Sequence, residues 1–112
     1  MVKTYKLQKN IKFLGFKNNT YKFFNTIDAY ITSSEAEGLG LAVIEAMSFA
    51  KPVLSNRLGA HRELNKNFRT GLIFKNYPDD IARKILIFIQ HSAYQKKKYG
   101  INSINTVKKK NI

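Results

Sequence analysis

Short apolar runs alternate along the chain with longer segments in which apolar residues recur at helical spacing. The short runs are rich in Ile, Val, Leu and Phe and end at turn-forming residues, which is typical of buried strands. We predict strands at residues 11–14, 29–32, 52–55 and 71–74. The other periodic segments predict helices at residues 18–24, 41–50, 60–64 and 81–90, and Pro78, Asp79 and Asp80 form a favourable start for the last helix.

This order of elements indicates the fold class. Strands that alternate with helices predict a parallel sheet, because parallel strands are joined by crossover connections that are usually helical. We therefore expect an α/β fold, a Rossmann-like parallel sheet with flanking helices, and assign residues 1–91 to it. Residues 92–112 hold six Lys and no acid and are predicted to form a basic C-terminal helix or tail. A solvated surface helix with a frayed end is favoured there over a membrane-binding surface.

Length and charge restrict the possible functions. A chain of 112 residues forms one modest domain and is too short for two lobes with a cleft between them. With 20 Lys and Arg against seven Asp and Glu, the net charge of +13 favours a phosphate-bearing partner: nucleic acid, an anionic membrane or a nucleotide. Sixteen of these 20 cations are Lys, so a compositional bias toward Lys is an equally good explanation of the charge.

The sequence lacks two features, and each absence excludes further classes of protein. The chain has no Cys, which excludes disulfides, thiolate zinc sites and thiol nucleophiles. Its apolar runs are far shorter than the ~20 residues of a membrane-spanning helix, and the basic N-terminus lacks the apolar region of a signal peptide. We therefore expect a cytoplasmic protein, with peripheral contact to the inner face of the membrane as an option for the Lys-rich tail.

The acidic residues are unevenly placed. Residues 1–27 and 81–112 contain no acid, whereas three of the seven acids fall between Glu35 and Glu45. In the same segment, Gly38 and Gly40 follow a predicted strand and open a predicted helix. Backbone N–H groups at such a turn suit a phosphate, because glycine allows close approach and the positive end of the helix faces the ligand. A steric role in the turn is the alternative, since a G-x-G pattern alone is weak.

Glu45 is the only charged residue between positions 41 and 50. It lies one turn from Leu41 on the same side of an otherwise apolar helix, so we expect it to be at least partly buried. A buried carboxylate needs partners, and ribose hydroxyls or an internal hydrogen bond to backbone or Ser48 satisfy it equally well. Glu37, just before the helix, either faces a transferred sugar or only complements the helix dipole.

The segment resembles the E-x(7)-E region of family 4 glycosyltransferases, which are retaining enzymes with the GT-B fold. The pattern comprises Ser33-Ser34-x-x-Glu37-Gly38-Leu39-Gly40-Leu41-x-x-x-Glu45-Ala46-Met47, then Lys51-Pro52-Val53 and Gly59-x-x-x-Glu63. Further matches are Phe13-Leu14-Gly15, Asp28-Ala29-Tyr30 and Thr70-Gly71-Leu72-Ile73-Phe74, so the resemblance covers residues 11–90. It implies an incomplete GT-B C-terminal domain, the part that binds the nucleotide sugar.

The resemblance also implies roles for particular residues. Glu37 is expected to contact the donor sugar as the catalytic carboxylate, and Glu45 the ribose hydroxyls. Backbone N–H groups of Gly38, Leu39, Gly40 and Leu41 are expected to bind sugar hydroxyls and the diphosphate, with Gly15 and Phe16 near the base. Such enzymes transfer a sugar from a nucleotide-diphosphate donor to a glycan or lipid-linked acceptor, with no catalytic metal and no other cofactor. No specific nucleic acid partner is expected.

Several features of the family pattern are missing. No segment before Ile11 matches the family's diphosphate-clamping Arg and Lys, and the N-terminal acceptor domain has no counterpart. Ala50 and Ala60 stand where relatives often have Gly, at little expected cost because Ala tolerates helical conformations. His61 is interpreted as a surface residue. We therefore expect the isolated chain to be inactive or weakly active. The alternatives are an inactive fragment and a basic module that binds nucleic acid or membrane surfaces.

Overall fold

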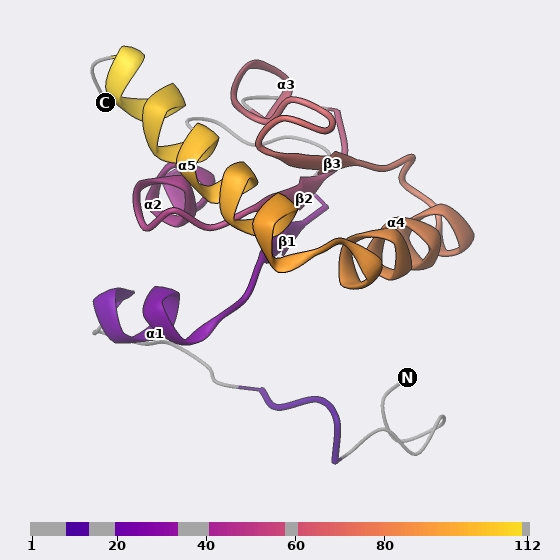
Figure 1. The fold of residues 1–112 in the computed structure, drawn as a ribbon. Helices are drawn as coiled ribbons and strands as arrows, with labels where there is room; N and C mark the ends of the chain where they lie inside the picture. The colour runs from indigo at the N-terminus through magenta and orange to yellow at the C-terminus, as the bar shows by residue number, and fades with distance from the viewer. Residues whose placement is uncertain (1–8, 14–19, 34–40, 58–60, 111–112) are drawn as a thin grey trace.

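A computed structural model describes residues 9–13, 20–33, 41–57 and 61–110 (Figure 1). Its centre is a parallel sheet with the order β1-β2-β3. The strands are β1 (Tyr30–Thr32), β2 (Val53–Ser55) and β3 (Gly71–Ile73). The helices are α1 (Thr20–Thr26), α2 (Leu41–Ser48), α3 (His61–Leu64), α4 (Pro78–Gln90) and α5 (Ala93–Lys109).

Strand β2 separates two apolar clusters, because successive strand residues point to opposite faces of the sheet. Val53 belongs to a cluster with residues of α2, α3 and α5, whose buried members are Val43, Met47, Leu64 and Val107. Leu54 belongs to the second, formed mainly by β3 and α4, with Leu72, Phe74, Phe88 and Tyr99. All three residues of β2 are buried, as expected for the middle strand of a sheet covered on both faces. The predicted fold class is confirmed.

The prediction of a strand at residues 11–14 is wrong for its described part. Residues 11–13 adopt no strand, and Phe13 is 82% exposed. Leu14 lies outside the described residues. A single extended segment is not stable in water without a neighbouring strand to complete its hydrogen bonds, and no described strand pairs with this one. Figure 1 shows the segment lying apart from the sheet, beyond α1.

The expectation that Ala50 adopts a helical conformation is also wrong. Its φ angle is +61°, in the left-handed region. The amide of Ala50 donates to Met47 O at 3.0 Å, and that of Lys51 donates to Ala46 O at 3.1 Å. This pair of bonds forms a Schellman cap, which turns the chain from α2 into β2 and requires the left-handed residue.

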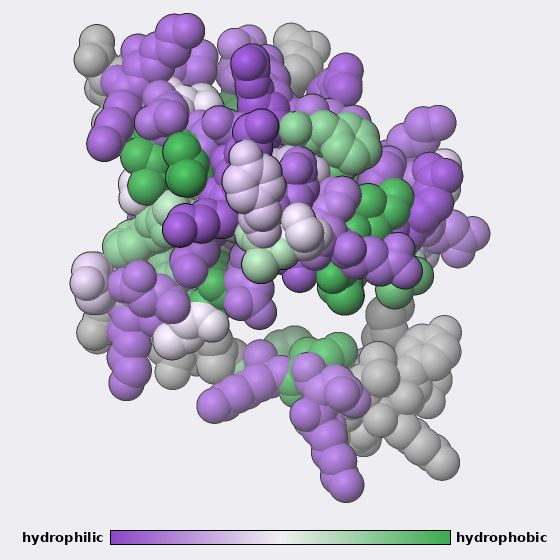
Figure 2. Space-filling view, in the orientation of Figure 1, coloured by the Kyte–Doolittle hydropathy of each residue, from purple (hydrophilic) through white to green (hydrophobic). Residues whose placement is uncertain are grey.

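Helix α5 begins at the predicted boundary of the C-terminal segment. Ser92 caps it by accepting a hydrogen bond from Gln95 N at 3.1 Å. The helix packs on α2 and β3 through one buried side that includes Tyr99, Gly100 and Val107. Most of its lysines are exposed, and hydrophilic residues cover much of the face drawn in Figure 2. No described helix is long and apolar enough to cross a bilayer.

Candidate functional site

The carboxyl ends of the three strands meet at one edge of the sheet, as they do in every parallel sheet. Ser33 follows β1, the buried Asn56 follows β2, and Asn76 lies just beyond β3. The Ser33 hydroxyl donates a hydrogen bond to Asn76 Oδ1, across the end of the middle strand. This bond joins the segments that follow the two outer strands.

Helix α2 carries the candidate ribose-binding carboxylate. Val43, Ala46 and Met47 face the core, whereas Leu41 at the first position is 61% exposed. Glu45 lies one turn after Leu41 and is half-buried, as predicted. The Ser48 hydroxyl donates to the backbone carbonyl of Glu45 at 2.7 Å, so it does not serve the carboxylate.

The Glu45 carboxylate has no hydrogen-bond or ion-pair partner among the residues that the structure describes. Removing a carboxylate from water without a partner is unfavourable, so a half-buried one close to a helix start is suited to accept hydrogen bonds from a ligand. The alternative of an internal hydrogen bond to Ser48 is therefore not realised.

The other predicted site residues lie outside the described residues. These are Gly15, Phe16, Glu37, Gly38, Leu39 and Gly40, and their roles stay predictions. The described part of the loop-helix junction begins at Leu41, which precedes Glu45 by one helical turn.

A pocket of about 530 Å³ opens at the carboxyl ends of β2 and β3. Three cationic side chains and three amide side chains line it, together with two apolar residues: Arg57, Lys75, Lys84, Asn56, Asn67, Asn76, Ile73 and Phe74. The described lining contains no carboxylate, so the pocket favours a polar, negatively charged ligand. Sequence reasoning missed this pocket. The available signal was the position of Asn56, Lys75 and Asn76 directly after two predicted strands.

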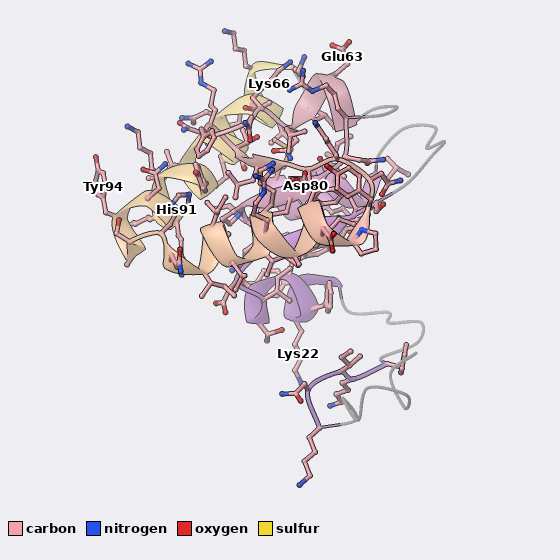
Figure 3. All side chains as sticks on the ribbon, turned by 90° about the vertical axis from the view of Figure 1, so that its right-hand side faces the viewer. Lys22, Glu63, Lys66, Asp80, His91 and Tyr94 are labelled. Atoms are coloured by element: carbon pink, nitrogen blue, oxygen red, sulfur yellow. The ribbon has the colours of Figure 1, made fainter. Side chains whose placement is uncertain are left out.

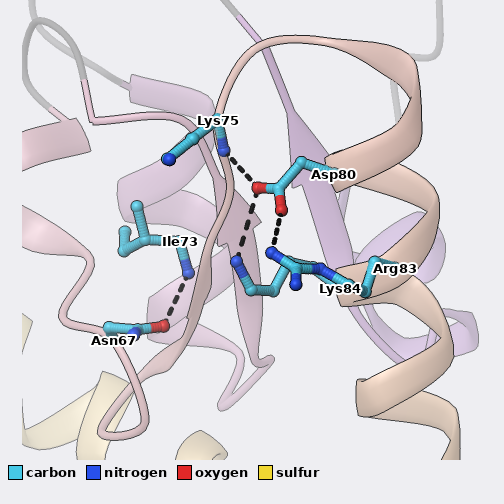
Figure 4. A network of polar contacts seen from close by, with 6 residues as sticks. All are labelled: Asn67, Ile73, Lys75, Asp80, Arg83 and Lys84. Atoms are coloured by element: carbon cyan, nitrogen blue, oxygen red, sulfur yellow. Dashed lines mark hydrogen bonds and ion pairs between the residues drawn. The ribbon is translucent and has the colours of Figure 1, made fainter.

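Asp80 organises the wall of this pocket (Figure 4). Its carboxylate accepts hydrogen bonds from Lys75 N at 2.6 Å, Arg83 Nη2 at 2.5 Å and Lys84 Nζ at 3.4 Å. The backbone hydrogen bond from Lys75, followed by that from Arg83, lowers the pKa of Asp80 from 3.8 to about 2. Asp80 therefore stays ionised at neutral pH and joins the end of β3 to the start of α4.

The histidines show no catalytic arrangement in the described part of the chain. His91 lies at the end of α4, and its Nε2 is 3.0 Å from the Tyr99 hydroxyl (Figure 3 labels His91). His61 begins α3, and its side chain is not among the described ones. Among the described residues, no group of three or more His, Cys, Asp or Glu side chains is placed to hold a metal ion.

The parallel sheet, its flanking helices and the polar carboxyl edge define a Rossmann-like domain of the type found at the C-terminus of GT-B glycosyltransferases. The solved C-terminal domain of a glycosyl transferase group 1 family protein from Francisella tularensis superposes with a TM-score of 0.81 and 25% identity, over 98% of this chain and 58% of that one. A glycosyltransferase from Rickettsia africae superposes with a TM-score of 0.87 and 26% identity, over 96% of this chain and 29% of that one.

The sequence places the chain within one family. The model of "Glycosyl transferases group 1" matches residues 1–105, and the chain belongs to this family. Among curated relatives, the O-antigen biosynthesis glycosyltransferase WbnH of Escherichia coli is 35% identical over 88 residues, 78% of this chain and 25% of that protein. An uncharacterised glycosyltransferase of Methanocaldococcus jannaschii is 31% identical over 90 residues, 78% of this chain and 26% of that protein. The chain thus spans about a quarter of these relatives.

Proposed function

We propose that the chain is the donor-binding part of a retaining family 4 glycosyltransferase that acts in the cytoplasm. It takes part in transfer of a sugar from a nucleotide-diphosphate donor to a glycan or lipid-linked acceptor in cell-surface polysaccharide synthesis. Family membership supports a glycosyl transfer, and the relatives include proteins named for O-antigen and capsular polysaccharide biosynthesis. Solved structures of the same fold include a cyanobacterial protein in complex with UDP-glucose.

The observation that carries this proposal is the carboxylate of Glu45. It is half-buried on an apolar helix, one turn from the helix start, and has no partner among the described residues. The two carboxylate oxygens suit a vicinal diol, in which each hydroxyl donates to one oxygen. The ribose of a nucleotide offers such a diol, and its diphosphate then reaches toward the positive end of the helix.

The remaining predicted residues complete the proposed donor site. Glu37 contacts the sugar, the amides from Gly38 to Leu41 bind the sugar hydroxyls and the diphosphate, and Gly15 and Phe16 contact the base. The bond between the anomeric carbon and the diphosphate oxygen breaks, and its electron pair passes to the diphosphate. The acceptor hydroxyl oxygen bonds to the same face of the sugar, and the hydroxyl proton passes to the leaving diphosphate. Amides and helix dipole stabilise the charge that develops on the leaving diphosphate, without a metal or another cofactor.

Calorimetric measurement of UDP-glucose binding to the purified chain tests the proposal. Glu45→Gln keeps the size of the side chain and removes its charge. We expect it to weaken binding at least about tenfold, because one hydrogen bond to a charged group contributes about 1.5–3 kcal/mol. Asp28→Asn is the matched control, since Asp28 is exposed at the opposite end of β1 and its loss leaves the proposed site intact.

The affinities of the two variants distinguish the proposal from its alternative. Equal affinities of Glu45→Gln and the unmodified chain would contradict the role of Glu45. The alternative, a basic nucleic-acid-binding or membrane-surface module, predicts instead an affinity for RNA or anionic vesicles that falls steeply with salt and is unchanged in both variants.

A further inference from the structure

The pocket at the carboxyl ends of β2 and β3 gathers cations from three separate segments. Arg57 follows β2, Lys75 follows β3, and Lys84 lies on α4. Figure 4 shows Lys75 and Lys84 on two sides of the Asp80 carboxylate. Because these cations are distant in sequence and meet only in the folded chain, a Lys-rich composition alone does not explain why they share one pocket.

Two of these three cations have no counter-ion. Lys84 Nζ lies 3.4 Å from Asp80 Oδ2, so its charge is partly compensated. Arg57 and Lys75 form no ion pair within the described residues, and Lys75 binds Asp80 through its backbone amide, which leaves its side chain free. Both charges are therefore available to an anion. A planar guanidinium can donate two parallel hydrogen bonds to phosphoryl oxygens, which makes Arg57 especially suited to a phosphate group.

Two amide side chains add neutral hydrogen-bond donors to the pocket. Asn67 Oδ1 accepts a hydrogen bond from Ile73 N at 2.9 Å, and Asn76 Oδ1 accepts one from the Ser33 hydroxyl. These bonds set the orientation of both amides and leave their Nδ2 groups without a partner in the described part of the chain. Each Nδ2 group can only donate, and the terminal oxygens of a phosphoryl group are strong acceptors. The amides therefore favour the same ligand as the cations.

The size of the pocket indicates a ligand larger than a phosphate ion. Its volume of about 530 Å³ falls within the range of pockets that hold small organic molecules. Ile73 and Phe74 also line it, and apolar side chains contact the carbon skeleton of a ligand better than its charged group. The described lining includes no residue of α2, so this pocket is built from other elements than the proposed ribose site at Glu45.

We propose that this pocket binds a phosphate monoester of a small polar molecule, the chemical class to which sugar phosphates belong. Arg57 and Lys75 neutralise the phosphoryl group, and Asn67 Nδ2 donates a hydrogen bond to it. The carbon skeleton of the ligand packs against Ile73. The proposal depends on the lining of this pocket and is independent of the role proposed for Glu45.

Calorimetry of the full chain with three probes tests this proposal. Glucose 1-phosphate carries both the phosphate and the carbon skeleton, inorganic phosphate carries the first alone, and glucose only the second. We expect glucose 1-phosphate to bind at least about tenfold more tightly than inorganic phosphate, and glucose not to bind detectably. Absence of glucose 1-phosphate binding overturns the proposal. Equal affinities for glucose 1-phosphate and inorganic phosphate overturn it in favour of a site for free phosphate.

Two substitutions in the pocket remove ligand contacts without removing bonds of the fold. Lys75→Gln keeps the backbone hydrogen bond to Asp80, and Asn67→Asp keeps the oxygen that accepts from Ile73 N. We expect each to weaken glucose 1-phosphate binding at least about tenfold, because hydrogen bonds to a charged group are the stronger ones, while the melting curve is retained. Lys98→Gln is the matched control, since Lys98 is exposed on α5 and does not line this pocket.

The variants also distinguish this pocket from the proposed donor site. Unchanged affinity for glucose 1-phosphate in Lys75→Gln and Asn67→Asp overturns the proposal, as does an equal loss in Lys98→Gln. We expect Glu45→Gln to leave the affinity for glucose 1-phosphate unchanged. A tenfold loss in Glu45→Gln would overturn the proposal, because the phosphate would then bind at the donor site. Failure of Glu45→Gln to weaken UDP-glucose binding contradicts only the role of Glu45 and does not alter these expectations.

Discussion

Ala50 has a backbone conformation that residues with a Cβ rarely adopt. Its left-handed φ angle of +61° is required by the cap at the end of α2, and the Cβ of an L-residue is strained there. The surrounding structure tolerates the strain because the chain must turn sharply between α2 and the buried strand β2. The family resemblance indicates that relatives often have glycine at this position. Only the structure shows why, because the residue here has a left-handed φ angle.

We predict that Ala50→Gly stabilises the protein by about 1 kcal/mol, because glycine adopts the left-handed conformation without strain. The free energy of unfolding in denaturant measures the effect. Ala82→Gly is the control, since Ala82 is exposed within α4 and glycine there costs about 1 kcal/mol. Destabilisation by both substitutions would show that the left-handed conformation of Ala50 is not strained.

Ionisation of Asp80 affects the stability of the fold. Its pKa is lowered from 3.8 to about 2 in the folded protein, so the ionised form is the one that folding favours. The stability it contributes is complete above about pH 4 and is lost as the pH falls toward 2. We predict that Asp80→Asn lowers the melting temperature by several degrees at neutral pH, and that the difference from the unmodified chain decreases over this acidic range.

The matched control for Asp80 is its neighbour. Asp79 is exposed and also lies in the first turn of α4, so Asp79→Asn makes the same change in net charge without removing the bonds to Lys75 and Arg83. Melting temperatures of both variants from pH 2 to 7 provide the comparison. A pH-independent difference for Asp80→Asn, or an equal effect of Asp79→Asn, would contradict the assignment.

At the level of elements, the contact of α5 with the end of α2 depends on one glycine. A Cβ added to Gly100 would lie 2.2 Å from the backbone oxygen of Ala50. Alanine normally stabilises a helix interior by up to about 1 kcal/mol relative to glycine, but here the two helices must move apart. The close approach lets a basic, surface-like helix take part in the core through Tyr99 and Val107.

We predict that Gly100→Ala destabilises the protein by about 1–3 kcal/mol, the usual cost of overpacking, despite the better helix propensity of alanine. Chemical denaturation measures it. Asn105→Ala, on the exposed side of the same helix, is expected to be neutral or slightly stabilising. A stabilised Gly100→Ala variant would mean that α5 does not pack closely on α2.

At the level of the whole molecule, the residues that the structure describes form a single parallel sheet with flanking helices. The chain spans about a quarter of its curated relatives, and the donor-site residues proposed for it are Gly15, Phe16 and those of the loop-helix junction from Glu37 to Glu45. Positioning of an acceptor and neutralisation of the leaving diphosphate are large terms in catalysis of group transfer. We therefore expect this domain to bind a nucleotide sugar without transferring the sugar.

We predict that the isolated chain transfers sugar from nucleotide-diphosphate donors at a rate that is zero or very low. Release of the nucleoside diphosphate from UDP-glucose and related donors, with and without glycan acceptors, measures this. The intact Escherichia coli relative serves as the positive control. A rate for the isolated chain that matches a two-domain enzyme would refute the prediction.

The sequence by itself determined the alternation of strands and helices, since the periodicity of apolar residues reflects which side of each element is buried. It also identified Glu45 as a half-buried charge, because no other charged residue shares its helix. These features depend on local spacing and on composition. The strand predicted at residues 11–14 failed for the described residues because a strand depends on a neighbour, which no local pattern supplies.

Only the tertiary structure decided how the ends of the strands and the edges of the sheet are used. The pocket lined by Arg57, Lys75 and Lys84 brings together residues from three separate segments, so no local motif predicts it. The left-handed Ala50 and the contact of Gly100 depend on how α2 and α5 meet. The order of the strands depends on hydrogen bonds between residues distant in sequence, such as that from Tyr30 N to Pro52 O, which form only when the sheet is assembled.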